Sequence, residues 1–429
     1  MSAPVVRRLR AVLLAVLLAA AGLLLALPLP AQDGGEEDIF SAEAFDQSVA
    51  ESRQEEQANK LEYLVGGTFL WNNTAVATQR FDGYNAGGAF TAKAFVRLTV
   101  PSYGSLYLGY NLSHTLYLGD GGVLDSGLPG TGADLFGNIY ALSEFYLSFD
   151  LGKKVFFRVG NQLLAWGPSF LWTPVDFVNL QRLDPLASVD LRVGKPALRL
   201  HVPMKKSNLF LFADFSRTVD PDTLEVYDLA RTTALAARWD LTALGFELGL
   251  SGYFGYDLPA SFGLDLSGRL LGFDVYGEAA LTADFPEEAV DYAVSAGLQR
   301  SFGELKDWSV QAEAFYQSAG QPDESGYPAP GGPGDVPGWF TPLCLGRWYA
   351  YAALAKEDLF ADFLDATLSG LLNASDLSYT IRLAAAFDPV GFIPFTFTLS
   401  YLGGGPGREF TWYTGGNAFS ASLEVRFEF

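Results

Sequence analysis

Cysteine, histidine and basic residues are scarce in this chain of 429 residues. The single cysteine, Cys344, excludes an intramolecular disulfide, and with only two histidines there is no Cys/His cluster of the kind that holds structural zinc. The 28 Lys and Arg stand against 49 Asp and Glu, a formal net charge of −21. Because nucleic-acid-binding proteins need basic patches to neutralise phosphates, this balance argues against such a protein. No cofactor is implied.

Long apolar runs are also absent, except at the N-terminus. Arg7, Arg8 and Arg10 precede an apolar run over residues 11–27, and prolines follow it. This pattern predicts an export signal over residues 1–31, cleaved after Ala31, whereas the alternative is an uncleaved anchor. Without the three arginines, 25 basic and 49 acidic residues leave a net charge of −24. No later window holds about 18 consecutive apolar residues, so either a secreted soluble protein or an outer-membrane barrel is expected.

Residues 32–60 form an acidic segment between the leader and the body of the chain. Ile39, Ala42, Phe45 and Val49 recur at roughly helical spacing and would form one weak apolar face. The segment therefore reads as a helix, as a small plug, or as a mobile tail. Intrinsic disorder of the whole chain is excluded, because aromatic residues make up 14% of it.

From residue 61 to residue 429 the period changes to two. Apolar residues alternate with small or polar ones in segments of about ten, and Gly, Asp, Asn and Pro separate the segments. In residues 246–254, for example, Phe246, Leu248 and Leu250 alternate with Glu247 and Gly249. Each segment carries charge on one face only. The pattern predicts an all-β, antiparallel domain, either a soluble sandwich or a transmembrane barrel.

Three features favour the barrel. Many segments have aromatic residues at their ends, where strands would cross the two membrane interfaces. The polar face is rich in Gly, Ser, Thr and ionisable residues, which suits a wet lumen. The last segment alternates strictly up to Phe427 and Phe429, and it resembles the assembly signal of bacterial outer-membrane β-barrels. That resemblance implies an outer-membrane location, contact with its lipids, and recognition of the C-terminal strand by the barrel-assembly machinery.

Connections sort into short and long ones, as expected for the two sides of such a barrel. The short ones are expected near residues 150–154, 240–242, 267–270 and 389–392, and the long ones at 120–138, 165–188 and 319–345. At roughly 20 to 24 residues per strand and connection, the barrel is expected to have about 16 strands, within a range of 14 to 18.

A barrel of this size is too wide for side chains to fill, so a water-filled pore is the expected consequence. Alternation predicts that certain charged residues point into it. They are Arg158, Arg192, Arg199, His201, Glu144, Asp214, Glu247, Glu278 and Glu313. A basic wall opposite an acidic wall would create a transverse field, an arrangement that resembles general porins. The alternative is that these charges are solvated or paired locally.

The stretch from Arg158 to Arg199 contains the spaced motif R-V-G-N-Q-L-L-A-W-G-P, followed by a loop dense in Trp, Pro and Asp. It resembles porin-like barrels of the alginate-export type and related uncharacterised groups. The resemblance implies passage of a saccharide or another anionic solute past Arg158, Arg192 and Arg199. The loop aromatics Trp166, Trp172 and Phe177 would stack on sugar rings or pack the loop inside the barrel.

These observations predict a porin-like channel for passive diffusion of small hydrophilic solutes, as a monomer or a trimer. The alternative is a plugged or non-conducting surface barrel, such as an adhesin or a specific transporter. An enzyme is not expected. Ser113, His114 and Asn111 suggest an outer-membrane lipase, but adjacent strand residues point to opposite faces, so Ser113 and His114 would not share a substrate.

Overall fold

The computed structural model describes most of the chain from residue 61 onward. The described ranges are 61–81, 84–101, 103–120, 139–178, 189–218, 227–285, 288–327, 345–388, 393–412 and 414–429. The expected export signal, the acidic segment at 32–60 and Cys344 lie outside them.

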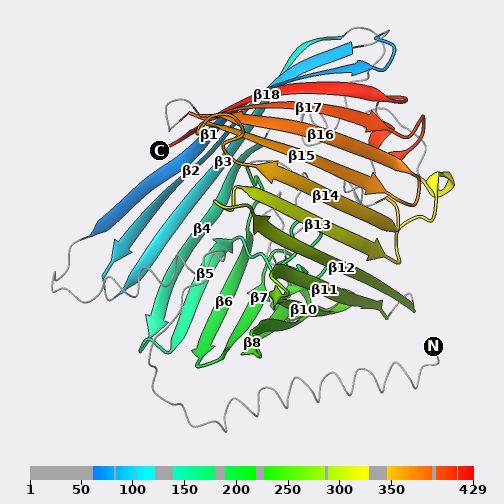
Figure 1. Cartoon of the computed structure of the whole chain (residues 1–429). Helices are drawn as coiled ribbons and strands as arrows, with labels where there is room; N and C mark the ends of the chain where they lie inside the picture. Colours follow the sequence, from blue (N-terminus) through cyan, green and yellow to red (C-terminus); the bar gives the residue numbers. More distant parts are fainter. Residues whose placement is uncertain are drawn as a thin grey trace.

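Eighteen antiparallel strands form one closed sheet (Figure 1). Each strand pairs with its neighbours in sequence, and β1 also pairs with β18, which closes the barrel. The strands are β1 (Glu62–Thr78), β2 (Tyr84–Val100), β3 (Gly104–Asp120), β4 (Ile139–Leu151), β5 (Val155–Gln162), β6 (Lys195–Met204), β7 (Ser207–Asp214), β8 (Ala234–Ala243), β9 (Phe246–Phe254), β10 (Ala260–Leu270), β11 (Phe273–Asp284), β12 (Ala289–Phe302), β13 (Trp308–Gln317), β14 (Trp348–Lys356), β15 (Leu364–Asn373), β16 (Ser378–Phe387), β17 (Phe395–Gly403) and β18 (Ala418–Glu428).

The all-β barrel expected from the alternation is confirmed, and its 18 strands lie at the upper end of the expected range of 14 to 18. Residues 61–429 number 369, so each strand with its connection takes about 20 residues (369/18), at the short end of the expected range. The strands range from eight residues in β5 and β7 to 17 in β1.

Helical structure in the described residues is limited to short connections: α3 (Leu229–Thr232), η2 (Glu324–Gly326) and η3 (Glu409–Thr411). Among the residues that the structure describes, no helix has the length and apolar character needed to cross a membrane.

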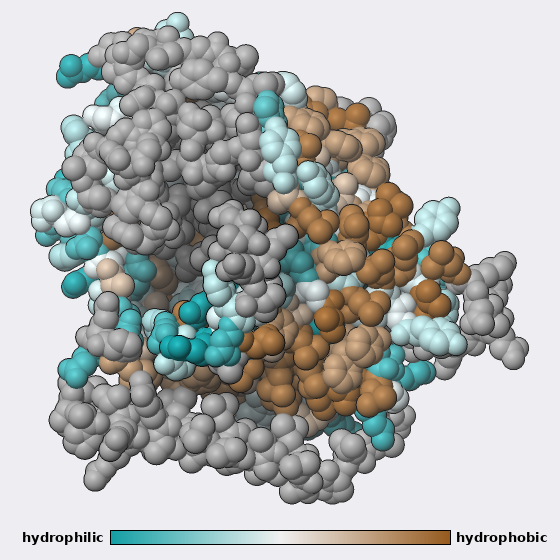
Figure 2. All heavy atoms as spheres, turned by 180° about the vertical axis from the view of Figure 1, so that it is seen from behind, coloured by the Kyte–Doolittle hydropathy of each residue, from teal (hydrophilic) through white to brown (hydrophobic). Residues whose placement is uncertain are grey.

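Alternation along each strand separates an apolar outer surface from a polar inner one. On β10, Leu264 is 50% exposed on the outside, whereas its neighbour Asp265 is 5% exposed and points inward. Figure 2 shows hydrophobic side chains gathered into a broad continuous area on one outer face. Apolar residues face outward along the strands, and in the described part of the chain the two larger buried apolar clusters lie inside the barrel, where a loop enters it.

The two ends of the barrel differ in the length of the connections between strands. One end, here called the short-turn rim, carries the first residue of β1, the chain end at Phe429 and the tight turns, among them 152–154, 205–206, 244–245 and 271–272. The other end, the long-loop rim, carries the connections 121–138, 163–194 and 318–347. The expected division into short and long connections is therefore confirmed. The turns expected at 240–242 and 267–270 lie a few residues further on, because β8 and β10 extend further than expected.

Candidate pore constriction

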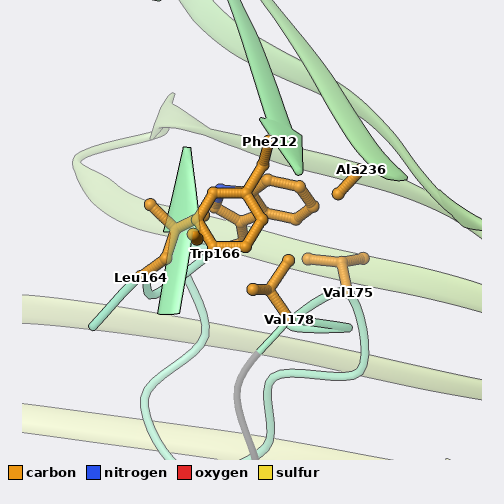
Figure 3. Packing of buried hydrophobic residues seen from close by; sticks show 7 residues of the cluster. Leu164, Trp166, Val175, Val178, Phe212 and Ala236 are labelled. Atoms are coloured by element: carbon orange, nitrogen blue, oxygen red, sulfur yellow. The ribbon is translucent and has the colours of Figure 1, made fainter. Parts of the chain in front are cut away.

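The connection after β5 folds into the barrel. Leu164, Trp166, Val175 and Val178 are buried in one cluster with Ala197, Phe212 and Ala236, which come from the inner faces of β6, β7 and β8 (Figure 3). Phe177 packs against the same cluster. Residues 163–178, here called the inner loop, therefore pack against the wall formed by β6, β7 and β8.

The tip of the inner loop reaches a different wall. Trp172 is 1% exposed and stacks on Phe315 of β13, with ring centroids 5.4 Å apart and planes 6° apart. Its ring centroid also lies 5.7 Å from that of Tyr349 of β14, and Leu371 of β15 belongs to the same buried cluster. Because β7 and β14 are seven strands apart in an 18-strand sheet, the inner loop crosses the interior between distant walls.

Glu313 of β13 holds the tip through its backbone. Its carboxylate accepts the N–H groups of Phe170 (2.9 Å), Leu171 (3.1 Å) and Trp172 (2.9 Å), and the hydroxyl of Tyr276 (2.9 Å). Three successive N–H groups that converge on one anion form the kind of concave backbone site that binds anions in other loops. Here the anion is supplied by the barrel wall.

Glu278 of β11 holds the loop at two further points. Its carboxylate accepts the N–H of Ser169 (2.8 Å) and that of Val175 (3.2 Å). Gly167 has a φ of +95°, and a Cβ at this position would lie 2.3 Å from a Glu278 carboxylate oxygen. Glycine is therefore required there both by the backbone conformation and by the space.

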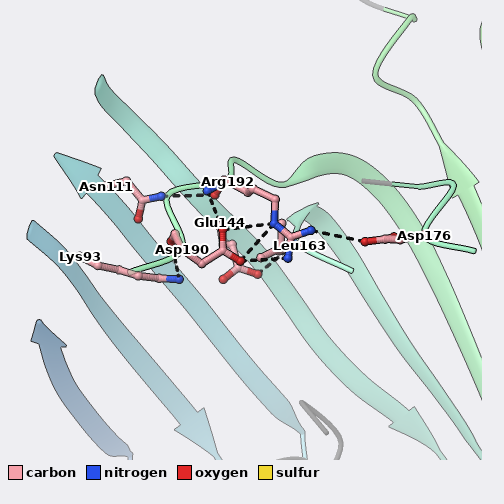
Figure 4. Close-up of polar contacts among 7 residues, drawn as sticks. All are labelled: Lys93, Asn111, Glu144, Leu163, Asp176, Asp190 and Arg192. Atoms are coloured by element: carbon pink, nitrogen blue, oxygen red, sulfur yellow. Dashed lines mark hydrogen bonds and ion pairs between the residues drawn. The ribbon is translucent and has the colours of Figure 1, made fainter. Parts of the chain in front are cut away.

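The returning limb, residues 189–194, is held by polar contacts (Figure 4). Arg192 pairs with Asp190 at 2.9 Å and with Asp176 of the inner loop at 3.4 Å. The backbone carbonyl of Asp190 accepts from Lys93 of β2 (3.4 Å), while Glu144 of β4 accepts the N–H of Leu163 (3.0 Å). The two limbs of the loop are thus tied together and tied to β2 and β4.

Two arginines line the inner wall between these anchors. Arg158 of β5 and Arg199 of β6 share the inner face. The Arg158 guanidinium lies over the Tyr146 ring at 4.2 Å, and that of Arg199 over the Phe210 ring at 5.1 Å. Tyr146 in turn stacks on Tyr107 of β3, with centroids 5.0 Å apart. A run of cations and aromatic faces therefore crosses β3 to β7.

Three other residues predicted to line the wall, His201, Asp214 and Glu247, lie at different positions along the barrel axis. His201 stacks on Phe210, with ring centroids 4.3 Å apart, and contacts Asn208 at 3.1 Å. Asp214 is buried and pairs with Lys195 at 3.5 Å. Glu247 is exposed at the short-turn rim, far from the inner loop.

The structure thus separates the predicted residues into different roles. The basic pair Arg158 and Arg199 and the acids Glu278 and Glu313 do lie on distant walls, as the field hypothesis requires, but both acids contact the inner loop backbone. Arg192 lies in the loop itself. Trp166, Trp172 and Phe177 all pack the loop. That any of these residues selects a solute stays a prediction.

One buried network at the long-loop rim had no counterpart in the sequence analysis. Glu409 of η3 is 4% exposed and accepts from Tyr349 Oη (2.6 Å), Asn373 Nδ2 (2.6 Å) and the N–H of Leu345 (3.2 Å). Burial raises the pKa of Glu409 to about 7. Its only signal in the sequence is a lone acid between Gly-rich and aromatic residues, which does not indicate burial.

The other predicted features have clear positions. Phe427 and Phe429 face outward, and Phe429 stacks on Phe69 with centroids 5.6 Å apart. Ser113 lies within 3.4 Å of Thr91, whereas His114 contacts Tyr140 on the outer surface, so the two do not converge. Within the described residues, no group of three or more His, Cys, Asp or Glu side chains is placed to hold a metal ion.

A closed antiparallel barrel with a loop folded into its interior is the architecture of outer-membrane porins. No protein-family model matches the chain, and no curated protein matches its sequence. Among solved structures, similar ones include a BenF-like porin from Pseudomonas fluorescens Pf-5 and OccK2 (OpdF) from Pseudomonas aeruginosa.

The TM-score is 0.53 for both, with sequence identities of 10% and 12%. Each match covers 86% of this chain, together with 98% of the BenF-like porin and 97% of OccK2. OccK11 (OpdR) of P. aeruginosa gives a TM-score of 0.51 at 9% identity, with 85% of this chain and 95% of that chain covered. At these identities the likeness concerns the fold alone. None of these three is an alginate-export protein, so the resemblance to that group stays at the level of a porin-like barrel.

Proposed function

We propose that the protein is an outer-membrane channel through which small hydrophilic solutes diffuse passively. The observation that carries this proposal is the combination of an apolar outer surface with a polar, charged inner wall in a closed 18-strand barrel, which is wide enough to enclose an aqueous passage. The inner loop, supported on distant walls, narrows that passage. The fold shared with the porins above supports the same assignment.

Anionic solutes, saccharide acids among them, are the preferred class in this proposal. Arg158 and Arg199 form part of the wall beside the inner loop, and the acids Glu278 and Glu313 are occupied by backbone N–H groups. In this proposal the basic wall supplies positive charge beside the inner loop. Membrane lipids and the barrel-assembly machinery are the other partners expected.

The second candidate is a barrel that the inner loop closes. The buried clusters around Trp166 and Trp172 favour it, because they fix the loop firmly inside the barrel. Single-channel recording of the refolded protein in planar bilayers separates the two. Discrete conductance steps, with a reversal potential in a salt gradient that indicates anion preference, support the open channel. A folded barrel that gives no steps contradicts it and favours a plugged transporter or surface protein.

A further inference from the structure

Charge is distributed unevenly around the short-turn rim. The turns 152–154 and 205–206, at the ends of the neighbouring hairpins β4–β5 and β6–β7, contain Lys153, Lys154, Lys205 and Lys206. All four are exposed, and in the part of the chain that the structure describes no carboxylate pairs with their ammonium groups. Asp150 accepts the backbone N–H of Lys153 at 2.9 Å. In a chain of net charge −21, this is a local basic surface, named here the lysine rim.

The opposite part of the same rim is acidic. The turns 303–307, 357–363 and 388–394 carry Lys306 as their one basic residue. Their acids are Glu304, Asp307, Glu357, Asp358, Asp362 and Asp388. The turns at 101–103, 244–245 and 271–272 contain no charged residue. An acidic chain that reaches this rim is therefore attracted to one side of the opening and repelled from the other.

The chain itself brings such a segment to this rim. Residues 33–60 contain nine acids and two basic residues, a net charge of −7 (2 − 9), and they lead directly into β1, which begins at the short-turn rim. At about 4.8 Å per strand, β5 lies about 19 Å and β7 about 29 Å around the rim from β1. A segment of 28 residues spans at most about 95 Å when extended, so its carboxylates reach the lysine rim with length to spare.

We infer that the acidic segment 33–60 docks on the lysine rim. The occupant is this chain's own segment. The ammonium groups of Lys153, Lys154, Lys205 and Lys206 pair with carboxylates such as those of Glu51, Glu55 and Glu56. The contact is electrostatic and multivalent, and it weakens at high salt because the screening length falls to about 3 Å at 1 M. The inference concerns the folded barrel and does not rest on the proposed passage of solutes.

Zero-length carboxylate-to-amine cross-linking, read by mass spectrometry, tests the docking directly. The refolded chain is treated at low salt and at 1 M NaCl, both as the full chain and as the chain from Gln32 onward. We expect links from residues 33–60 to the four lysines of the rim, at least fivefold fewer links at high salt, and none to the matched exposed residue Lys306. Links to Lys306 at equal yield, or no links from the segment, would overturn the inference.

Proteolysis gives a second readout that needs no cross-link. Cleavage after Glu51, Glu55 and Glu56 by a glutamate-specific protease is expected to be about tenfold faster in the variant with all four rim lysines changed to Gln, and unchanged in Lys306→Gln. Heat-modifiable migration on gels confirms that each barrel is folded. If the fourfold variant does not fold, the pairs K153Q/K154Q and K205Q/K206Q replace it. Equal cleavage rates in wild type and folded variants contradict docking. The two proposals can fail separately. A barrel that conducts no ions but still gives the cross-links would contradict the porin proposal and leave the docking of residues 33–60 supported.

Discussion

Arg158 and Arg199 lie directly opposite one another on β5 and β6, with their Cα atoms in register on the same face of the sheet. Like charges in this position destabilise a sheet. Here each guanidinium lies over a separate ring, Tyr146 for Arg158 and Phe210 for Arg199, so cation–π attraction offsets part of the repulsion. A pair kept at some cost to stability is a reasonable target for tests of function.

Changing both arginines to Glu should reverse the ion preference of the channel. The two substitutions change the charge of the wall beside the inner loop from +2 to −2. The reversal potential in a KCl gradient is therefore expected to move toward cation selectivity. The control is R158K/R199K, which keeps the charge and should keep the preference. Unchanged selectivity in a folded R158E/R199E barrel would place the pair away from the narrowest part of the passage.

Glu313→Gln should loosen the inner loop. The amide retains one acceptor oxygen and loses the charge that three N–H groups share, which is expected to cost about 2 to 4 kcal/mol of unfolding free energy. Urea unfolding followed by tryptophan fluorescence measures the loss, because Trp172 lies at the contact. Glu247→Gln at the exposed rim is the matched control and should be near neutral. Equal stability of the two variants would show that the loop is held by its apolar contacts alone.

Gly167→Ala tests whether the space around the loop matters in addition to its backbone conformation. The added Cβ would meet the Glu278 carboxylate at 2.3 Å. Gly245 has a φ of +80° and nothing within 4 Å, so Gly245→Ala reports the backbone strain alone, about 1 kcal/mol. We expect Gly167→Ala to lose at least about 2 kcal/mol more, measured by the same unfolding assay. Similar losses at both glycines would argue against the close contact.

The packing of residues 404–412, which contain Glu409, against the barrel should become less stable as the pH rises. The pKa of Glu409 in the fold is about 7, above its ordinary value of 4.5, so the folded state favours the protonated acid. The stabilisation is complete below about pH 4.5 and is lost progressively up to about pH 7, by up to about 3 kcal/mol. Amide hydrogen exchange of residues 404–412, corrected for intrinsic rates, should be slower at pH 5 than at pH 8. Glu409→Gln should remove this difference and Glu357→Gln should keep it; a difference that persists in Glu409→Gln would assign the effect to another group.

The architecture was predictable because it depends on a local pattern. Alternation places Leu264 outside and Asp265 inside whatever the strand's partners are, and the end of the chain at Phe427 and Phe429 indicated the class of barrel. The strand number was less accessible, because it depends on where strands such as β8 and β10 end, and Gly or Asp within a strand resembles a turn.

The contents of the barrel were only partly predictable. That Glu278 and Glu313 point inward followed from alternation. Their partners did not, because the N–H groups they bind belong to residues that are 103 to 143 positions away in sequence. Glu409 was missed for the same reason, since its partners Leu345, Tyr349 and Asn373 come from distant connections and strands.

The inner loop also bears on the mechanics of the barrel. A closed sheet of 18 strands resists stretching along its circumference, but little opposes its flattening into an oval. A loop that is bound to β6–β8, to β11 and to β13–β15 acts as a cross-brace, because any flattening must stretch its contacts at Glu278 and Glu313. Enlarging the passage by shortening this loop would therefore be expected to soften the cross-section of the whole barrel as well.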